Sequence, residues 1–333
     1  MRKENHKLFL NWIKKNNARV AVSLSSGGAE AMGRDLALME MLTELNFPID
    51  EIHGCSAGAP VAATYAFYHP TSHEDYDVTK RELSMKQMCK SYLHVMRFSN
   101  IFEFSFGSIK NIIKTRTAKS LTGLFKGDKL EKDIAHYLPG TFSDCHKELF
   151  IYAEKESDMN YEVFNKEKYP HMPLHEAIRA SISMPHFFEP KEFKGKNYID
   201  GGMLINTPLL AIYENYKNTI DDAKRPLVIF ACTALYPYEE VTPQKNLWTV
   251  MKDRYFYKLM SRIFFLELND MLEKKNVFIF LFHPQIEKIK GLAFQKVDNY
   301  RMKNKPNFYN LYHDYLKKIQ YKKFSKALFK HKY

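Results

Sequence analysis

The sequence predicts an α/β protein of three layers, in which a mainly parallel central sheet lies between two layers of helices. Apolar segments of strand length alternate with longer helical segments, which is the pattern of parallel sheets with crossover helices. The segment 226–234, PLVIFACTA, is apolar throughout, as expected for a strand that helices cover on both faces. The 333 residues are enough for one large domain of this class with additions.

The order of the segments supports this alternation. Strands are expected at 18–24, 49–53, 149–154, 226–234 and 276–282, and helices at 34–45, 59–68, 127–137, 173–183 and 246–275. Asp128 is expected to cap the N-terminus of its helix, and Pro173 to lie in the first turn of the next one. A polar, aromatic and irregular stretch at about 71–126 indicates a variable insertion in a domain that covers 18–290.

Composition excludes several classes of protein. The four cysteines lie far apart without a C-x-x-C pair, so neither a zinc or iron–sulfur site nor a disulfide framework is expected. The first residues lack the apolar core of a secretory signal, and no apolar run is long enough to span a bilayer. We therefore expect a cytoplasmic protein without metal or other cofactor, and the sequence leaves the oligomeric state open.

The segment 301–333 is a basic tail. It holds ten lysine or arginine residues and one acidic residue, Asp314, and thus most of the formal net charge of +12. Apolar residues recur among the lysines at steps of mostly three or four, which predicts an amphipathic helix. They are Phe308, Tyr312, Tyr315, Ile319, Phe324 and Leu328. Such a helix fits peripheral contact with an anionic membrane, or its apolar face packs on the domain. Nucleic acid is not expected, because no base-reading motif accompanies the charge.

The segment Gly54–Gly58, GCSAG, is the motif that carries the most chemistry. It matches G-x-S-x-G and lies between an expected strand and an expected helix, which is the setting of a nucleophile elbow. The flanking Gly54 and Gly58 allow a sharp turn and close backbone packing. The helix that follows directs free N–H groups toward the reacting oxygen. Ser56 is therefore the candidate nucleophile.

Two further turns supply candidate partners for Ser56. The loop Ser25-Ser26-Gly27-Gly28 follows the first strand, and its backbone N–H groups are suited to stabilise an oxyanion. Asp200, followed by Gly201 and Gly202, ends another strand-like segment, so its carboxylate is suited to accept the serine proton.

In this order, the three motifs resemble those of the patatin-like phospholipases, which carry a Gly-rich oxyanion loop, a G-x-S-x-G elbow and a D-G-G or D-G-A turn. The resemblance covers about 18–234 and extends to other segments, at 124–130, 141–144, 180–190 and 198–208. It implies a patatin-like fold and a Ser56–Asp200 dyad without an essential histidine. It also implies a membrane phospholipid or lysophospholipid as the substrate.

The loop departs from the family pattern at three positions. Ser26 stands where the family has its first glycine, Glu30 where it has a basic residue, and Ala31 where it has its last glycine. The oxyanion hole is expected to consist of the backbone N–H groups of Gly27, Gly28 and Ser26. A negative charge on Glu30 would oppose a forming oxyanion unless the side chain points away.

Two other interpretations of the motifs stay open. A general serine esterase with a Ser-His-Asp triad would need a histidine late in the chain, such as His283 or His313, whereas His53 and His186 are expected to be structural. A catalytically weak or inactive lipid-binding protein would keep the fold with an altered loop.

Overall fold

The computed structural model describes residues 2–68, 123–158, 160–219, 225–233, 258–283 and 296–321. Within these ranges, an eight-stranded sheet forms the centre of the molecule. Its strands lie side by side in the order β10 (Val277–Phe282), β9 (Leu227–Cys232), β1 (Arg19–Leu24), β2 (Glu51–Cys55), β4 (Glu148–Lys155), β8 (Lys196–Asp200) and β7 (Lys191–Phe193), and β5 (Tyr161–Phe164) also pairs with β4. The strands from β10 to β4 run parallel, and β5, β8 and β7 join antiparallel to their neighbours.

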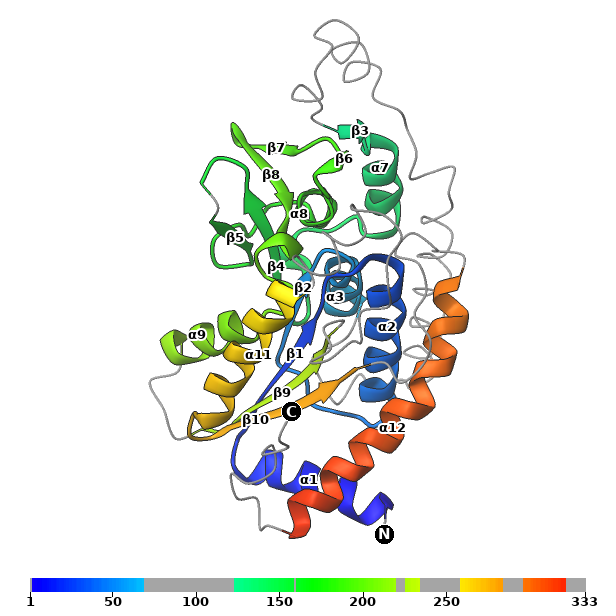
Figure 1. The fold of residues 1–333 in the computed structure, drawn as a ribbon, viewed down its shortest axis with the longest axis vertical. Helices are drawn as coiled ribbons and strands as arrows, with labels where there is room; N and C mark the ends of the chain where they lie inside the picture. Colours follow the sequence, from blue (N-terminus) through cyan, green and yellow to red (C-terminus); the bar gives the residue numbers. More distant parts are fainter. Residues whose placement is uncertain are drawn as a thin grey trace, which may run out of the picture.

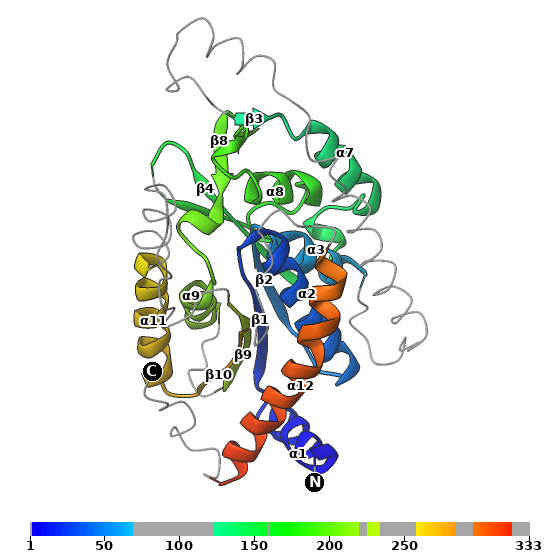
Figure 2. The same cartoon turned by 45° about the vertical axis from the view of Figure 1, so that its right-hand side comes forward.

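Helices cover both faces of this sheet (Figure 1, Figure 2). They are α1 (Arg2–Lys15), α2 (Gly28–Glu44), α3 (Gly58–Tyr68), α7 (Asp128–Tyr137), α8 (Leu174–Ser181), α9 (Leu209–Thr219), α11 (Lys258–Glu273) and α12 (Val297–Tyr321). Alternate residues of β1 separate the two layers: Val20 and Val22 join the core that contains α1, α2, α3 and α12, whereas Ala21 joins the core under α9 and α11. The predicted three-layer α/β fold is confirmed.

Smaller elements extend the domain beyond the carboxyl ends of the parallel strands (Figure 1). The strands β3 (Gly123–Phe125) and β6 (His186–Phe188) form a separate parallel pair. The short 3₁₀ helices are η2 (Phe142–Asp144) and η3 (Gly201–Met203), the second directly after β8. No helix within the described ranges has both the length and the apolar character needed to cross a bilayer.

Several element boundaries differ from those expected. The helix expected at 34–45 begins earlier, at Gly28. The predicted start is too late because the small residues between Gly28 and Gly33 hide the helical periodicity. The second strand runs over 51–55, so the first residues of the elbow motif belong to the strand itself. Asp128 is not a cap but the first helical residue, preceded by Gly127 as N-cap with φ 80°. Similarly, Pro173 is the N-cap residue of α8. Most of the expected insertion at 71–126 and the first part of the expected helix at 246–275 lie outside the described residues.

The apolar face of the basic tail is packed on the domain over the described part of its helix. Phe308, Tyr312 and Leu316 of α12 are buried in the core shared with α1 and α2. The interpretation that this face binds a membrane is therefore wrong for these residues, and the docking alternative holds. Phe324 and Leu328 lie outside the described residues.

Ion pairs attach the same helix to α2. Arg301 bonds to Glu40, and the Lys305 ammonium lies 2.9 Å from Glu40 and 2.5 Å from Glu44. The Tyr309 hydroxyl also donates to Glu44. Part of the positive charge that the sequence concentrates in this segment is thus paired with acidic residues of the domain.

Replacing Phe308 by alanine tests this packing. Phe308 is 0% exposed, and its ring is tilted against that of Phe282 at 5.3 Å between ring centroids. Its truncation should lower the free energy of unfolding by about 3–5 kcal/mol, because a buried aromatic side chain leaves a cavity. Chemical denaturation measures the loss. Met302→Ala, on the same helix at 59% exposure, is the matched control and should change stability by less than about 0.5 kcal/mol. Equal effects of the two variants would contradict the packing of α12.

Candidate active site

Ser56 occupies a strained turn between β2 and α3. The strand ends at Cys55, the helix begins at Gly58, and Ser56 itself has φ 50°. This left-handed conformation is uncommon for a residue with a side chain and marks the nucleophile elbow of hydrolases. The Ala59 N–H closes the turn by donating to the Ser56 carbonyl at 3.0 Å. Ser56 is thus held at the N-terminus of α3, as the motif predicts.

The motif glycines allow this turn to pack against its neighbours. A Cβ atom on Gly58 would lie 2.7 Å from the carbonyl group of Leu24, the last residue of β1. A Cβ atom on Gly54 would lie 2.7 Å from the Gly58 oxygen. The elbow lies directly against the end of β1, and for this reason only glycine fits at these two positions.

The side chain that reaches Ser56 is Asp200. The Ser56 Oγ donates to Asp200 Oδ2 at 2.6 Å, and both residues are buried. Sheet register explains the contact, because β4 lies between β2 and β8. Cys55 pairs with Tyr152, and Asp200 pairs with Ala153, the next residue of β4. Ser56 and Asp200 therefore flank β4 at the same level.

Burial makes Asp200 a stronger base than an exposed aspartate. It raises the pKa of the Asp200 carboxyl to about 6, although hydrogen bonds from Ser56 and Gly202 act to lower it. The Gly202 N–H donates to Oδ1 at 2.7 Å, which directs Oδ2 toward the serine. A carboxylate in this state can accept the Ser56 proton near neutral pH.

Ser181, at the end of α8, is a further residue of the site that sequence reasoning missed. Its Oγ accepts the Ser56 N–H at 2.9 Å and donates to the Tyr152 carbonyl at 2.6 Å. It therefore ties the elbow to β4. The segment 180–190 that resembles the family contains this serine, but nothing in the segment assigns it a role, and it lies 125 residues from Ser56 in the chain.

The candidate oxyanion loop lies at the N-terminus of α2. Gly27 has φ 137° and Gly28 has φ 63°, conformations that favour glycine, and Gly28 is the first residue of the helix. The first N–H groups of a helix have no acceptor within it, and the helix dipole adds positive potential there. The backbone of Gly27 and Gly28 is therefore suited to receive a developing negative charge.

Ser26 anchors this loop to the segment that follows Asp200. Its N–H donates to the Asn206 carbonyl at 2.9 Å, and the Asn206 side-chain amide donates to the Ser26 Oγ at 2.5 Å. The expectation that Ser26 adds a backbone donor to the oxyanion hole is corrected, because its N–H is already engaged. A Cβ atom on Gly202 would lie 2.5 Å from the Ser26 Cβ, and one on Gly201 would lie 2.5 Å from the Tyr152 oxygen.

Glu30 is turned toward α12. Its Oε1 accepts hydrogen bonds from Arg34 at 3.1 Å and from the Tyr300 hydroxyl at 3.2 Å. A buried cation therefore balances the negative charge that stands in the basic position of the loop.

The histidines expected late in the chain lie elsewhere. His283 follows β10, which is three strands from β2 and so about 14 Å away at ordinary strand spacing. His313 is on α12, beside the ring of Tyr312. His53 is buried in β2, where its Nδ1 lies 2.7 Å from the Tyr152 hydroxyl and its ring stacks on Phe150. The arrangement favours a Ser–Asp pair over a triad.

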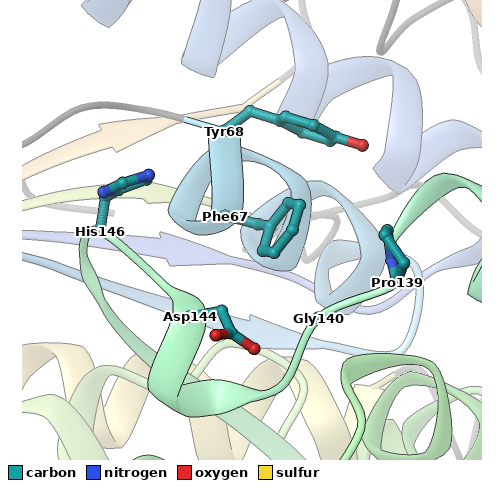
Figure 3. Close-up of a pocket in the computed structure, with 6 residues that line it drawn as sticks. All are labelled: Phe67, Tyr68, Pro139, Gly140, Asp144 and His146. Atoms are coloured by element: carbon teal, nitrogen blue, oxygen red, sulfur yellow. The ribbon is translucent and has the colours of Figure 1, made fainter.

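A pocket of about 500 Å³ lies at the other end of α3 from Ser56 (Figure 3). Its lining residues are Phe67, Tyr68, Pro139, Gly140, Asp144 and His146. The Phe67 ring points toward Gly140, where a Cβ atom would lie 2.2 Å from it. The length of α3 separates this pocket from the Ser56–Asp200 pair. Within the described ranges, His, Cys, Asp and Glu form no group of three or more that could hold a metal ion.

Comparison with known sequences identifies relatives. A family model described as patatin-like phospholipase matches residues 22–213, more than half of the chain, and this range includes Ser56 and Asp200. An uncharacterized protein of Acanthamoeba polyphaga mimivirus is 33% identical over 108 residues, which cover 29% of this chain and 35% of that protein. The chain thus spans only about a third of the viral relative. The uncharacterized protein YqhO of Bacillus subtilis is 29% identical over 238 residues, covering 67% of this chain and 73% of YqhO.

Two solved structures are similar at low sequence identity. VipD from Legionella pneumophila matches with a TM-score of 0.41 and 15% identity, over 88% of this chain and 66% of VipD. A chain of the ExoU–SpcU complex from the type III secretion system of Pseudomonas aeruginosa matches with a TM-score of 0.36 and 16% identity, over 90% of this chain and 52% of that chain.

Burial of Asp200 predicts a stability gain on removing its charge. The pKa rises from 3.8 to about 6 on folding, so the folded state binds the proton more tightly and loses stability as the pH rises from about 4 to about 6. Asp200→Asn should therefore raise the free energy of unfolding by about 2–3 kcal/mol at pH 7.5, and the gain should vanish near pH 4. Denaturation at several pH values measures it.

Glu192→Gln is the control, because Glu192 is an exposed carboxylate on β7 and should leave the pH dependence unchanged. A gain that is absent at pH 7.5, or that persists unchanged at pH 4, would show that burial does not penalise the Asp200 charge.

Proposed function

Because the chain belongs to the patatin-like phospholipase family, we propose that it hydrolyses acyl esters of lipids through Ser56 and Asp200. The observation that carries the proposal is the 2.6 Å hydrogen bond from the Ser56 Oγ to a buried carboxylate. A serine hydroxyl needs a base within this distance to become a nucleophile. Asp200 meets the requirement in both distance and basicity.

In the proposed first half-reaction, the Ser56 Oγ attacks the ester carbonyl carbon while its proton moves to Asp200 Oδ2. The carbonyl oxygen becomes an oxyanion, which the N–H groups of Gly27 and Gly28 stabilise. The intermediate then expels the alcohol portion of the lipid, which takes the proton from Asp200. An acyl group remains bound to the Ser56 oxygen.

The second half-reaction repeats the same steps with water. Asp200 takes a proton from the water as the water oxygen attacks the acyl carbon, and the same N–H groups stabilise the second oxyanion. The bond to the Ser56 oxygen breaks, the serine regains its proton from Asp200, and a fatty acid leaves. Asp200 passes on each proton that it accepts, so it is ionised again at the end of the cycle.

The proposed substrate is a membrane phospholipid or lysophospholipid. The family description supports a lipid ester, and the positively charged C-terminal region supports approach to an anionic membrane surface. Within the part of the tail that the structure describes, such a contact would use exposed lysines of α12, such as Lys303, Lys317 and Lys318, because the apolar face of this helix is buried.

Substitutions at the two residues test the proposed reaction. Ser56→Ala and Asp200→Asn should each lower kcat/KM for a water-soluble short-chain ester by at least about 10³-fold, because each removes a group that acts in every step. Wild-type kcat/KM should fall about tenfold per pH unit below pH 6, since only ionised Asp200 accepts the proton.

Ser143→Ala, on η2 away from the site, is the matched serine control and should keep wild-type activity.

Mass spectrometry of mixed phospholipid vesicles incubated with the wild type and with Ser56→Ala identifies the product. Fatty acid released equally by both would reject Ser56 as the nucleophile. A wild type that releases none would favour a lipid-binding protein without activity.

Charge reversal tests the membrane contact. Lys303→Glu combined with Lys318→Glu should weaken cosedimentation with anionic phospholipid vesicles by at least about 30-fold, at roughly 1 kcal/mol for each lysine removed. Hydrolysis of the water-soluble ester should stay unchanged. Unaltered cosedimentation of the double variant would exclude this face of α12 from the contact.

A further inference from the structure

Arg34 is a fully buried cation beneath the candidate oxyanion loop. Its side chain is 0% exposed and extends from the second turn of α2 back toward the start of the helix. One guanidinium nitrogen donates to the Ser25 Oγ at 3.1 Å, and another donates to Glu30 Oε1 at 3.1 Å. The guanidinium fork thus joins the loop to the first turn of α2.

The contacts continue to the C-terminal helix. The Tyr300 hydroxyl donates to the same Glu30 oxygen at 3.2 Å. The Tyr300 ring lies so close to α2 that a Cβ atom on Gly33 would be 3.0 Å from it. Ser25, Arg34, Glu30 and Tyr300 therefore form a continuous hydrogen-bonded chain from the loop to α12, and all four residues are buried.

A gain in folding stability does not explain this row of hydrogen bonds. A cation near a helix N-terminus is opposed by the helix dipole, and replacing a buried ion pair by apolar groups is often neutral or stabilising. Burial acts to lower the pKa of Arg34, and Asp35 and Glu30 are needed to hold it above its usual value. What the arrangement does supply is a fixed geometry at Ser25.

Fixed geometry is what the adjacent glycines lack. Gly27 and Gly28 have no side chains to hold them, yet an oxyanion hole acts only when its donors are already in place. Asn206 holds the loop at Ser26, and Arg34 holds it at Ser25. The two residues that precede the candidate donors are therefore both fixed by hydrogen bonds.

We propose that Arg34 is a positioning residue, whose guanidinium, held by Glu30 and Tyr300, fixes Ser25 and with it the N–H groups of Gly27 and Gly28. Arg34 lies one helical turn after Glu30, which stands at the position where the family pattern has a basic residue. The Arg34 side chain thus brings a cation to the loop from another position. The effect of Arg34 on catalysis rests on the proposed function, whereas its positioning of the loop does not.

The test compares Arg34→Met, Arg34→Lys and Ser25→Ala with the wild type. Arg34→Met should lower kcat for a water-soluble short-chain ester by about 10- to 100-fold and change KM by less than about threefold, because misplaced donors affect the transition state. Arg34→Lys should recover part of the loss, since lysine keeps the charge without the fork. Ser25→Ala should show a smaller loss in the same direction.

Arg19→Met is the matched control for loss of a mostly buried arginine. Arg19 pairs with Glu51 and Glu148 at the opposite end of β1, so this variant should keep the wild-type kcat whatever it does to stability. Equal losses of kcat in Arg19→Met and Arg34→Met would reduce Arg34 to a structural role and overturn the proposal.

Amide hydrogen exchange of residues 25–28 gives a readout that does not need turnover. Exchange should be faster in Arg34→Met and Ser25→Ala than in the wild type, and unchanged in Arg19→Met. If the wild type shows no hydrolysis, the proposed function fails while exchange still decides the positioning role. Wild-type exchange in both Arg34→Met and Ser25→Ala would overturn the proposal. Should Arg34→Met fail to fold, Ser25→Ala and Arg34→Lys decide by the same two measurements.

Discussion

The candidate site depends on the register of β4 between β2 and β8. Ser56 follows β2 and Asp200 ends β8, and these two strands are not neighbours in the sheet. A slip of one residue in either pairing would turn a side chain to the other face and separate the two groups. Ser181 adds a second tie to the same strand, because its hydroxyl joins the Ser56 N–H to the Tyr152 carbonyl. The short Oγ–Oδ2 distance is therefore a property of the sheet.

The sheet also keeps the site in a state that the isolated residues would avoid. Ser56 has a left-handed backbone, and Asp200 is a carboxylate away from water. Each costs about 1–3 kcal/mol, and each suits a serine nucleophile beside its base. The large cores on both faces of the sheet hold these conformations in place.

The C-terminal helix illustrates how an amphipathic pattern can leave its partner undetermined. The spacing of Phe308, Tyr312 and Leu316 predicts one apolar face, but an apolar face fits a membrane as well as a protein core. The position of α12 beside α2 in both views settles the matter for these residues (Figure 1, Figure 2). Arg301 and Lys305, which precede these residues on α12, form ion pairs with Glu40 of α2, and the charge count of the segment alone does not reveal them.

The sequence by itself determined the alternation of strands and helices, the elbow at Gly54–Gly58, and the candidate pairing of Ser56 with Asp200. These features depend on residues close together in the chain, or on motifs whose order is diagnostic, so local spacing is sufficient. The three-dimensional structure decided which residues support them. Ser181, Asn206 and Tyr300 reach their partners across 125, 180 and 270 residues, and no periodicity records such contacts. The raised pKa of Asp200 and the engaged N–H of Ser26 likewise follow from burial and hydrogen bonding, which exist only once the sheet has assembled.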